Sequence, residues 1–149
     1  MSAISFYHLE RTSLDRALPK LLQKALERGH RAVVIAGSDK RVEALNSALW
    51  TFEEQSFLPH GSESDGCADR QPVYLTTHDE NPNGSDVLVL VDGAESKSLS
   101  SFARVLDMFD GHDAEAVQAA RTRWQKLKEQ GYDLAYWQQT PQGGWEQKS

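Results

Sequence analysis

The sequence predicts a single-domain α/β fold with a mainly parallel central sheet. Segments typical of strands and of helices alternate along the chain, and this order leads to right-handed crossovers between parallel strands. The run "RAVVIAG", residues 31–37, is apolar almost throughout and rich in β-branched residues, as is typical of a strand buried on both faces of a parallel sheet. A length of 149 residues fits one domain with its own hydrophobic core.

The first strand and the first helix are expected before this buried run. Residues 4–9, "ISFYHL", alternate apolar and polar side chains and predict a strand. A helix should follow, capped by Thr12 or Ser13, with apolar residues at three- and four-residue steps until Gly29 ends it. Pro19 lies inside this pattern and lacks an amide donor, so we expect the helix to start near it or to kink there.

A second helix and a long loop are expected after the buried run. Ser38 or Asp39 caps the helix, which continues to about Trp50. The periodic pattern then lapses over residues 51–71, where "HGSESDGCADRQP" has the Gly, Ser, Asp and Pro content of a loop. The segments "VYLTT" and "DVLVLVD" predict two further strands, of which the second is apolar enough to be central.

The segment "KSLSSFARVLDMFDGHD" allows two interpretations. It can form one continuous helix, or a short helix near Ser98 followed by a strand through Leu106 and Met108. We favour the short helix followed by a strand.

The last third of the chain predicts a helix, a strand and a tail. Asp113 caps a helix that runs to about Gln130 and ends at Gly131. The segment "YDLAYWQQ" alternates like an edge strand. Residues 140–149 contain Pro, Gly and mostly polar side chains, so we expect a flexible C-terminal tail after a domain of residues 1–139.

Composition excludes several classes of protein. A net charge of -6 opposes binding to phosphate backbones, unless the basic residues gather on one face. The single cysteine, Cys67, cannot form an internal disulfide, which fits a reducing compartment. Neither a signal-like N-terminal segment nor an apolar run of membrane-spanning length occurs. We expect a cytoplasmic protein that binds neither membranes nor nucleic acid directly.

Few residues suggest catalysis at the carboxyl ends of the strands, where α/β proteins hold their ligands. The turn "AGSDK" matches neither common phosphate-binding loop. Asp92 and Glu95 in "LVDGAES" could hold a divalent cation, so the alternative function is a metal- or nucleotide-dependent α/β enzyme that uses the Asp92 turn. A strand-end Asp followed by Gly is more often a turn former, and we expect no enzyme activity.

Zinc ligands are also unpromising. His60, Cys67 and His78 stand alone in predicted loops, whereas structural zinc sites show closely paired ligands such as CxxC. We therefore expect no metal and no cofactor.

The helix "DAEAVQAARTRWQKLKEQG" carries the most informative pattern. Three apolar residues share the side expected to pack on the sheet: Ala116, Ala120 and Leu127. A second stripe, within about 60° of arc, comprises Val117, Arg121, Trp124 and Lys128. Two cations that flank an indole could bind a peptide that carries carboxylates and an aromatic ring.

Two other interpretations of this stripe remain open. Trp124 could complete the core while the cations are solvated. Alternatively, single-stranded DNA could bind to Trp124 and the basic residues of the helix, which are Arg121, Arg123, Lys126 and Lys128. The net acidity and the division of these cations between two sides of the helix count against DNA.

The stretch "LWTFEEQSFLPHG" places large apolar side chains in a predicted surface loop. They are Trp50, Phe52, Phe57 and Leu58. Loops run over the surface, so these side chains either fold back onto the core or contact a partner.

Several of these motifs together resemble the chi subunit of bacterial DNA polymerase III. The motif "ALW" with "SFLPH" shortly after it, and the motif "RTRWQKLKEQGYDLAYWQQ", carry the resemblance. The segments "SFYHL", "ERGHRAVVIAGS" and "LDMFDG" also fit, so the similarity extends to about Gln139. It implies a three-layer α/β/α fold and a non-enzymatic accessory subunit in DNA replication.

The resemblance also implies partners. Family members bind the acidic, Phe-ending C-terminal peptide of single-stranded DNA-binding protein (SSB), and some bind the psi subunit, which tethers them to the clamp loader. By motif position, the peptide site comprises Arg121, Trp124 and Lys128, with Arg123 and Val117 beside them. The psi interface comprises Trp50 and Phe57, with Phe52 and Leu58 beside them, or this surface serves another partner such as a repair helicase. Val117 and Gln125 stand where some relatives carry basic residues.

Overall fold

The computed structural model describes residues 3–10, 14–50, 61–62, 72–81, 84–142 and 144–148. Its strands are β1 (Ala3–Leu9), β2 (Ala32–Ile35), β3 (Gly61–Ser62), β4 (Val73–Thr76), β5 (Val87–Val91), β6 (Arg104–Asp110), β7 (Asp133–Gln139) and β8 (Trp145–Gln147). Its helices are α1 (Leu14–Glu27), α2 (Asp39–Trp50) and α3 (Ala114–Glu129), with a short 3-10 helix, η3 (Leu99–Ser101).

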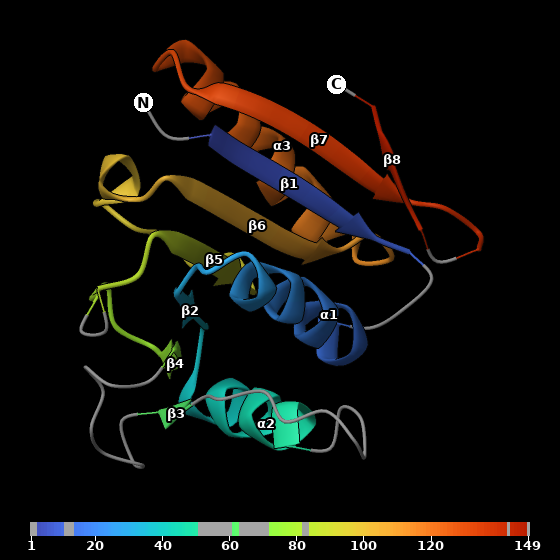
Figure 1. Ribbon diagram of the computed structural model, residues 1–149. Coiled ribbons are helices and arrows are strands. Elements are labelled where there is room, and N and C mark those ends of the chain that lie inside the picture. The colour runs from blue at the N-terminus through green and yellow to red at the C-terminus, as the bar shows by residue number, and fades with distance from the viewer. Residues whose placement is uncertain are drawn as a thin grey trace.

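The described strands form one sheet in the order β3-β4-β2-β5-β6-β1-β7-β8. All neighbouring strands are parallel except β7 and β8, which are antiparallel. The predicted α/β class and the mainly parallel sheet are confirmed. Strand β1 lies between β6 and β7, so residues from opposite ends of the chain become neighbours (Figure 1).

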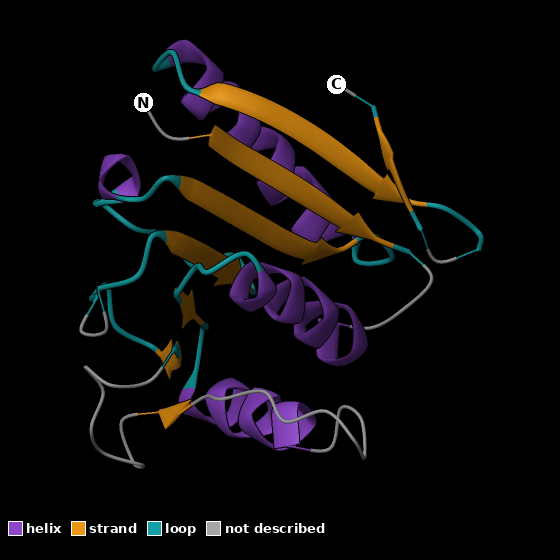
Figure 2. Ribbon diagram, in the orientation of Figure 1, coloured by secondary structure: helices purple, strands orange, loops and turns teal. Residues whose placement is uncertain are grey.

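Helices cover both faces of the sheet, as Figures 1 and 2 show. Helices α1 and α2 lie on one face, where Leu18, Leu22 and Leu45 pack against strand residues such as Val89. Helix α3 lies on the opposite face, over β6 and β7. One apolar core cluster lies on each face of the sheet, between the strands and the helices that cover them. The fold therefore has the three layers that the chi resemblance implies.

Local signals in the sequence account for three helix boundaries. The Asp113 carboxylate accepts hydrogen bonds from the backbone amides of Glu115 (3.0 Å) and Ala116 (3.3 Å), as predicted for the N-cap of α3. Gly29 and Gly131 have φ of 83° and 86°, the left-handed conformation that ends helices. Helix α1 begins at Leu14 and continues through Pro19, so the prediction of a helix start near Pro19 is wrong. The kink at Pro19 stays a prediction.

The segment that allowed two interpretations forms the short helix η3 and then strand β6, which confirms the one we favoured. The long loop expected over residues 51–71 is described only at Gly61–Ser62, which form β3 beside β4. The candidate caps Thr12 and Ser13 lie outside the described residues.

The structure differs from prediction at the C-terminal edge of the sheet. Strand β7 is not an edge strand, because β8 pairs with it and places Gln147 opposite Trp137. Residues 145–147 of the expected flexible tail thus belong to the sheet. The Trp145 ring packs edge-on against Tyr7, with centroids 5.0 Å apart. The polar composition of residues 140–149 could not predict this contact, because Tyr7 lies far away in the sequence.

Loss of the α3 cap should destabilise the fold measurably. We expect Asp113→Ala to lower the free energy of unfolding by about 1 kcal/mol, because two amides of the first turn lose their acceptor. This loss corresponds to a fall in Tm of roughly 2–4 °C for a domain of this size, measurable by thermal denaturation. Glu129→Ala, which removes an exposed carboxylate from the other end of α3, is the control. Equal Tm values for the two variants would contradict the capping role.

Candidate functional site along helix α3

Helix α3 rests on the sheet through a side of small and apolar residues. Ala120 is 1% exposed, and Ala116 and Leu127 pack against the same core cluster. The side that the sequence predicts to face the sheet is therefore confirmed. Small side chains allow the helix to lie close to β6 and β7, so the residues that flank this side meet the strands directly.

A buried ion pair joins α3 to β6. The Arg123 guanidinium donates two hydrogen bonds to the Asp107 carboxylate, from Nε to Oδ2 at 2.7 Å and from Nη2 to Oδ1 at 2.9 Å. The two side chains are 12% and 4% exposed. Burial raises the pKa of the Asp107 carboxyl, and the hydrogen bonds and charge of Arg123 oppose that rise.

The Trp124 indole lies on the strands beside this pair. Its ring is half-buried and meets Phe6 of β1 and Tyr136 of β7 edge-on, with centroids 5.4 and 5.8 Å away. The ring is thus neither wholly enclosed nor free in solvent. Aromatic contacts of this geometry fix the orientation of the indole and leave part of it accessible.

Arg121 and Lys128 are exposed along the same edge of α3, and Val117 packs against the core one turn before Arg121. The residues of the predicted stripe therefore lie along one edge of α3, with one solvent-facing cation on each side of the indole. Arg123 departs from the predicted set because its guanidinium points to the sheet and is paired with Asp107.

Polar groups of β1 and β7 extend the site at the Arg121 end. His8 Nδ1 and the Tyr136 hydroxyl are 2.5 Å apart, and both groups lie within the electrostatic influence of Arg121. Burial raises the pKa of Tyr136, while the Arg121 charge lowers it. Burial also lowers the pKa of His8. Neither residue could be assigned to the site from the sequence, because only the pairing of β1 with β7 brings them to α3.

An open depression of about 420 Å³ lies on the outward side of α3 beside Arg121. Its lining residues are all polar or charged: Gln118, Arg121, Thr122, Gln125, Lys126 and Glu129. Two cations against one carboxylate make this surface locally positive. Arg121 borders both the depression and the Trp124 edge, so one guanidinium can contact a ligand on either side.

The alternative site at the Asp92 turn has a different character. A cleft of about 1100 Å³ lies there, at the carboxyl ends of β1, β5 and β6, as expected for this fold class. Asp92 has a φ of 56°, and its Oδ2 lies 3.0 Å from Arg41 Nε, so this carboxylate already has a cationic partner. Within the described residues, no group of three His, Cys, Asp or Glu side chains is placed to hold a metal ion.

Several predicted residues are not among those that the structure describes. The Trp50 side chain and residues Phe52, Phe57 and Leu58 lie outside the described part of the chain, as do His60 and Cys67. The predicted partner surface around Trp50 and Phe57 therefore stays a prediction. Of the zinc candidates, only His78 is described, and it is exposed.

A family comparison decides the class of protein. Residues 1–135 match the model of a family described as the DNA polymerase III chi subunit, HolC. The chain belongs to this family. The resemblance recognised in the sequence is thereby confirmed, and the chain is an accessory subunit of a replicative DNA polymerase.

Individual relatives agree with the family assignment. The chain is 27% identical over 138 residues to the "DNA polymerase III subunit chi" of Pseudomonas aeruginosa, covering 90% of this chain and 94% of that protein. The Escherichia coli protein of the same name is 26% identical over 142 residues, covering 90% and 96%. A "Probable DNA polymerase III subunit chi" of Rickettsia prowazekii is 28% identical over 109 residues, covering 73% of this chain and 66% of that protein. Among the described residues, no helix is long and apolar enough to cross a membrane.

Removal of the Arg123 cation should destabilise the fold. We expect Arg123→Ala to reduce the free energy of unfolding by about 3–5 kcal/mol at neutral pH, because it leaves a buried carboxylate without its partner. In the variant, the folded pKa of Asp107 lies above its unfolded value near 3.8, so the deficit should shrink as the pH falls through the folded pKa.

Urea denaturation near pH 7 and near pH 5 measures this difference. The double variant Asp107→Leu with Arg123→Met is the control, because apolar groups in place of both charges leave neither of them unpaired. A deficit in Arg123→Ala that is small at pH 7, or that grows as the pH falls, would contradict the assignment.

Proposed function

We propose that the chain is a non-catalytic subunit that binds the acidic C-terminal peptide of SSB along the α3 edge and links it to the clamp loader. The observation that carries this proposal is the exposed Arg121 beside a Trp124 ring that Phe6 and Tyr136 hold in place. The peptide carboxylates pair with Arg121 and Lys128, and its terminal Phe side chain packs beside Trp124.

The energetics predict a modest affinity that depends on salt. A hydrogen bond between charged partners contributes roughly 1.5–3 kcal/mol, and less where the partners are exposed. Arg121 and Lys128 are both exposed, so dissolved ions screen their attraction for the peptide. Val117 and Gln125 supply no charge here, so binding relies on few cations.

The link to the clamp loader is assigned to the aromatic segment after α2. Large rings such as Trp50 and Phe57 are typical anchors of protein interfaces, and Phe52 and Leu58 would widen the same apolar surface. The psi subunit is the proposed partner for this segment, with a repair helicase as another. An enzyme based on the Asp92 turn is not proposed, since Arg41 already pairs with that carboxylate.

Substitution of Arg121 tests the peptide site. We expect Arg121→Gln to weaken binding of an acidic, Phe-ending peptide by about fivefold in calorimetry, because an exposed charge-assisted contact of roughly 1 kcal/mol is lost. The Tm should stay nearly unchanged, since the side chain is exposed. Binding by the wild-type chain should also weaken as salt rises.

Lys40→Gln provides a matched control, because it removes one exposed cation from α2 on the other face of the sheet. It should bind the peptide as the wild type does. Unaltered affinity in Arg121→Gln, or an equal loss in both variants, would remove the site assignment.

A further inference from the structure

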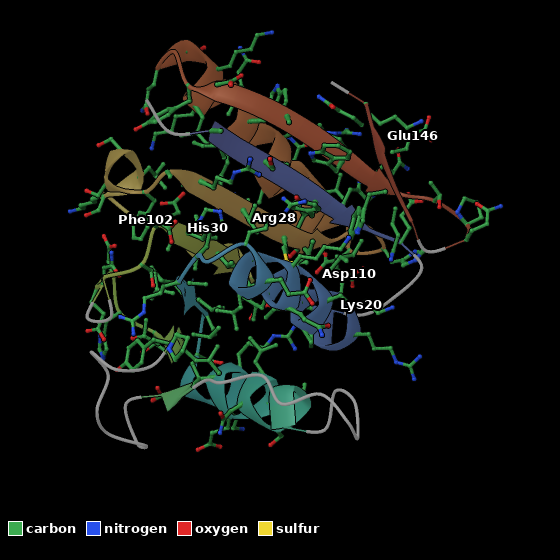
Figure 3. All side chains as sticks on the ribbon, in the orientation of Figure 1. Lys20, Arg28, His30, Phe102, Asp110 and Glu146 are labelled. Carbon is green, nitrogen blue, oxygen red and sulfur yellow. The ribbon has the colours of Figure 1, made fainter. Side chains whose placement is uncertain are left out.

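Helix α1 and the turn after it carry a row of basic side chains, the basic ridge, which winds around the helix axis by about 40° per step. Arg16, Lys20, Lys24 and Arg28 follow one another at four-residue steps, which corresponds to a rise of about 6 Å per step along the helix. All four side chains are exposed, and none makes an ion pair with another described residue. Figure 3 labels Lys20 and Arg28, which mark the course of this basic ridge on the α1 side of the sheet.

This basic ridge contrasts with the charge of the whole chain. The chain has a net charge of -6, yet the ridge gathers three positive charges on α1 and a fourth on Arg28, just after the helix. The acidic residues of α1, Asp15 and Glu27, reduce the excess by two charges. Attraction of cations to the C-terminal end of the helix dipole explains only part of this row of charges, because Lys24 is the one basic residue in the last turn of α1. The ridge therefore offers a local attraction for a chain of negative charges.

Aromatic side chains lie on the same side of the sheet, beside α1. Tyr7 of β1 stacks on Trp137 of β7 with centroids 6.5 Å apart and planes 11° apart, and Trp145 of β8 meets Tyr7 edge-on. Tyr7 and Trp145 pack against the same core cluster as the apolar side of α1, which places this aromatic group on the α1 face. All three rings are only partly buried.

The part of the sheet that holds these rings has little cover. Helix α1 packs over β2 and β6, and among the described residues no helix lies over β1 and β7 on this face (Figure 1). The neighbouring residues that point the same way, Ser5 and Ala135, are small and uncharged. Arg104, at the start of β6, is exposed, and its charge acts on the Tyr7 phenol. On this face, the Arg104 cation lies at the start of β6, and the exposed carboxylates of Asp110 and Asp133 lie at the end of β6 and the start of β7.

We propose that the α1 face binds single-stranded nucleic acid, with phosphates along the basic ridge and bases against the rings beside Trp137. Regularly spaced cations neutralise successive phosphates, and aromatic rings that are partly accessible can stack on bases of any sequence. This proposal departs from the expectation of no direct nucleic-acid contact, because four of the 16 basic residues follow one another along α1 and the turn after it. It lies across the sheet from Arg121 and is independent of the peptide site.

Fluorescence anisotropy of a labelled oligothymidylate with the full chain tests the proposal. The wild-type chain should bind at low salt and lose affinity as salt rises, with a slope of log K against log salt near -3, or about -0.7 per phosphate neutralised. Lys20→Gln with Lys24→Gln should weaken binding about tenfold and reduce the slope by about 1.4. This double variant should bind the acidic peptide as the wild type does.

The double variant Lys126→Gln with Lys128→Gln is the matched control, because it removes the same charge from α3 on the opposite face. It should bind the oligonucleotide like the wild type. No binding by the wild-type chain at the lowest salt, or an equal loss in both double variants, would overturn the proposal. Tighter binding to a duplex of the same length would overturn the stacking of bases. A loss of peptide binding in the α1 variant would assign the basic ridge to an acidic peptide instead.

Discussion

The buried ion pair between Arg123 and Asp107 fixes the rotation of α3 about its own axis, and so determines which of its side chains face the sheet and which face solvent. A helix that packs on a sheet through alanine and leucine could rotate by a fraction of a turn with small changes in buried area. Two hydrogen bonds from one guanidinium to a carboxylate that is only 4% exposed allow a single rotation. With Arg123 committed to the sheet, Trp124 falls onto Phe6 and Tyr136, and Arg121 is left facing solvent.

Much of this arrangement follows from the sequence, because its signals are local. The continuous apolar strands, the Asp113 cap and the side of α3 that meets the sheet all follow from residue spacing. The role of Asp107 does not, since one acid within an alternating strand looks like a solvent-facing position. The contact between His8 and Tyr136 depends on the pairing of β1 with β7, two strands that lie more than a hundred residues apart in the sequence. Strand β8 is likewise held by a distant ring, Tyr7.

The two faces of the sheet have different chemistry. On the α3 side, cations flank a fixed indole, and the strands beneath supply aromatic and polar side chains that suit a short acidic peptide. On the α1 side, the basic ridge and the rings around Trp137 suit a longer and more regular polyanion. A replication subunit with both surfaces could hold SSB and the strand that SSB coats at the same time, which makes the net acidity of the chain a poor guide to its partners.

The central claim, that the α3 edge is the peptide site, is tested most directly by the indole N–H signals in a nitrogen-15 NMR spectrum. The chain has four tryptophans, and Trp124 is on the α3 face while Trp137 and Trp145 are on the other. Titration with the acidic, Phe-ending peptide should shift the Trp124 signal, assigned through Trp124→Phe, and leave those of Trp137 and Trp145 in place. Shifts confined to Trp137 and Trp145, or an unchanged Trp124 signal at saturation, would contradict the account.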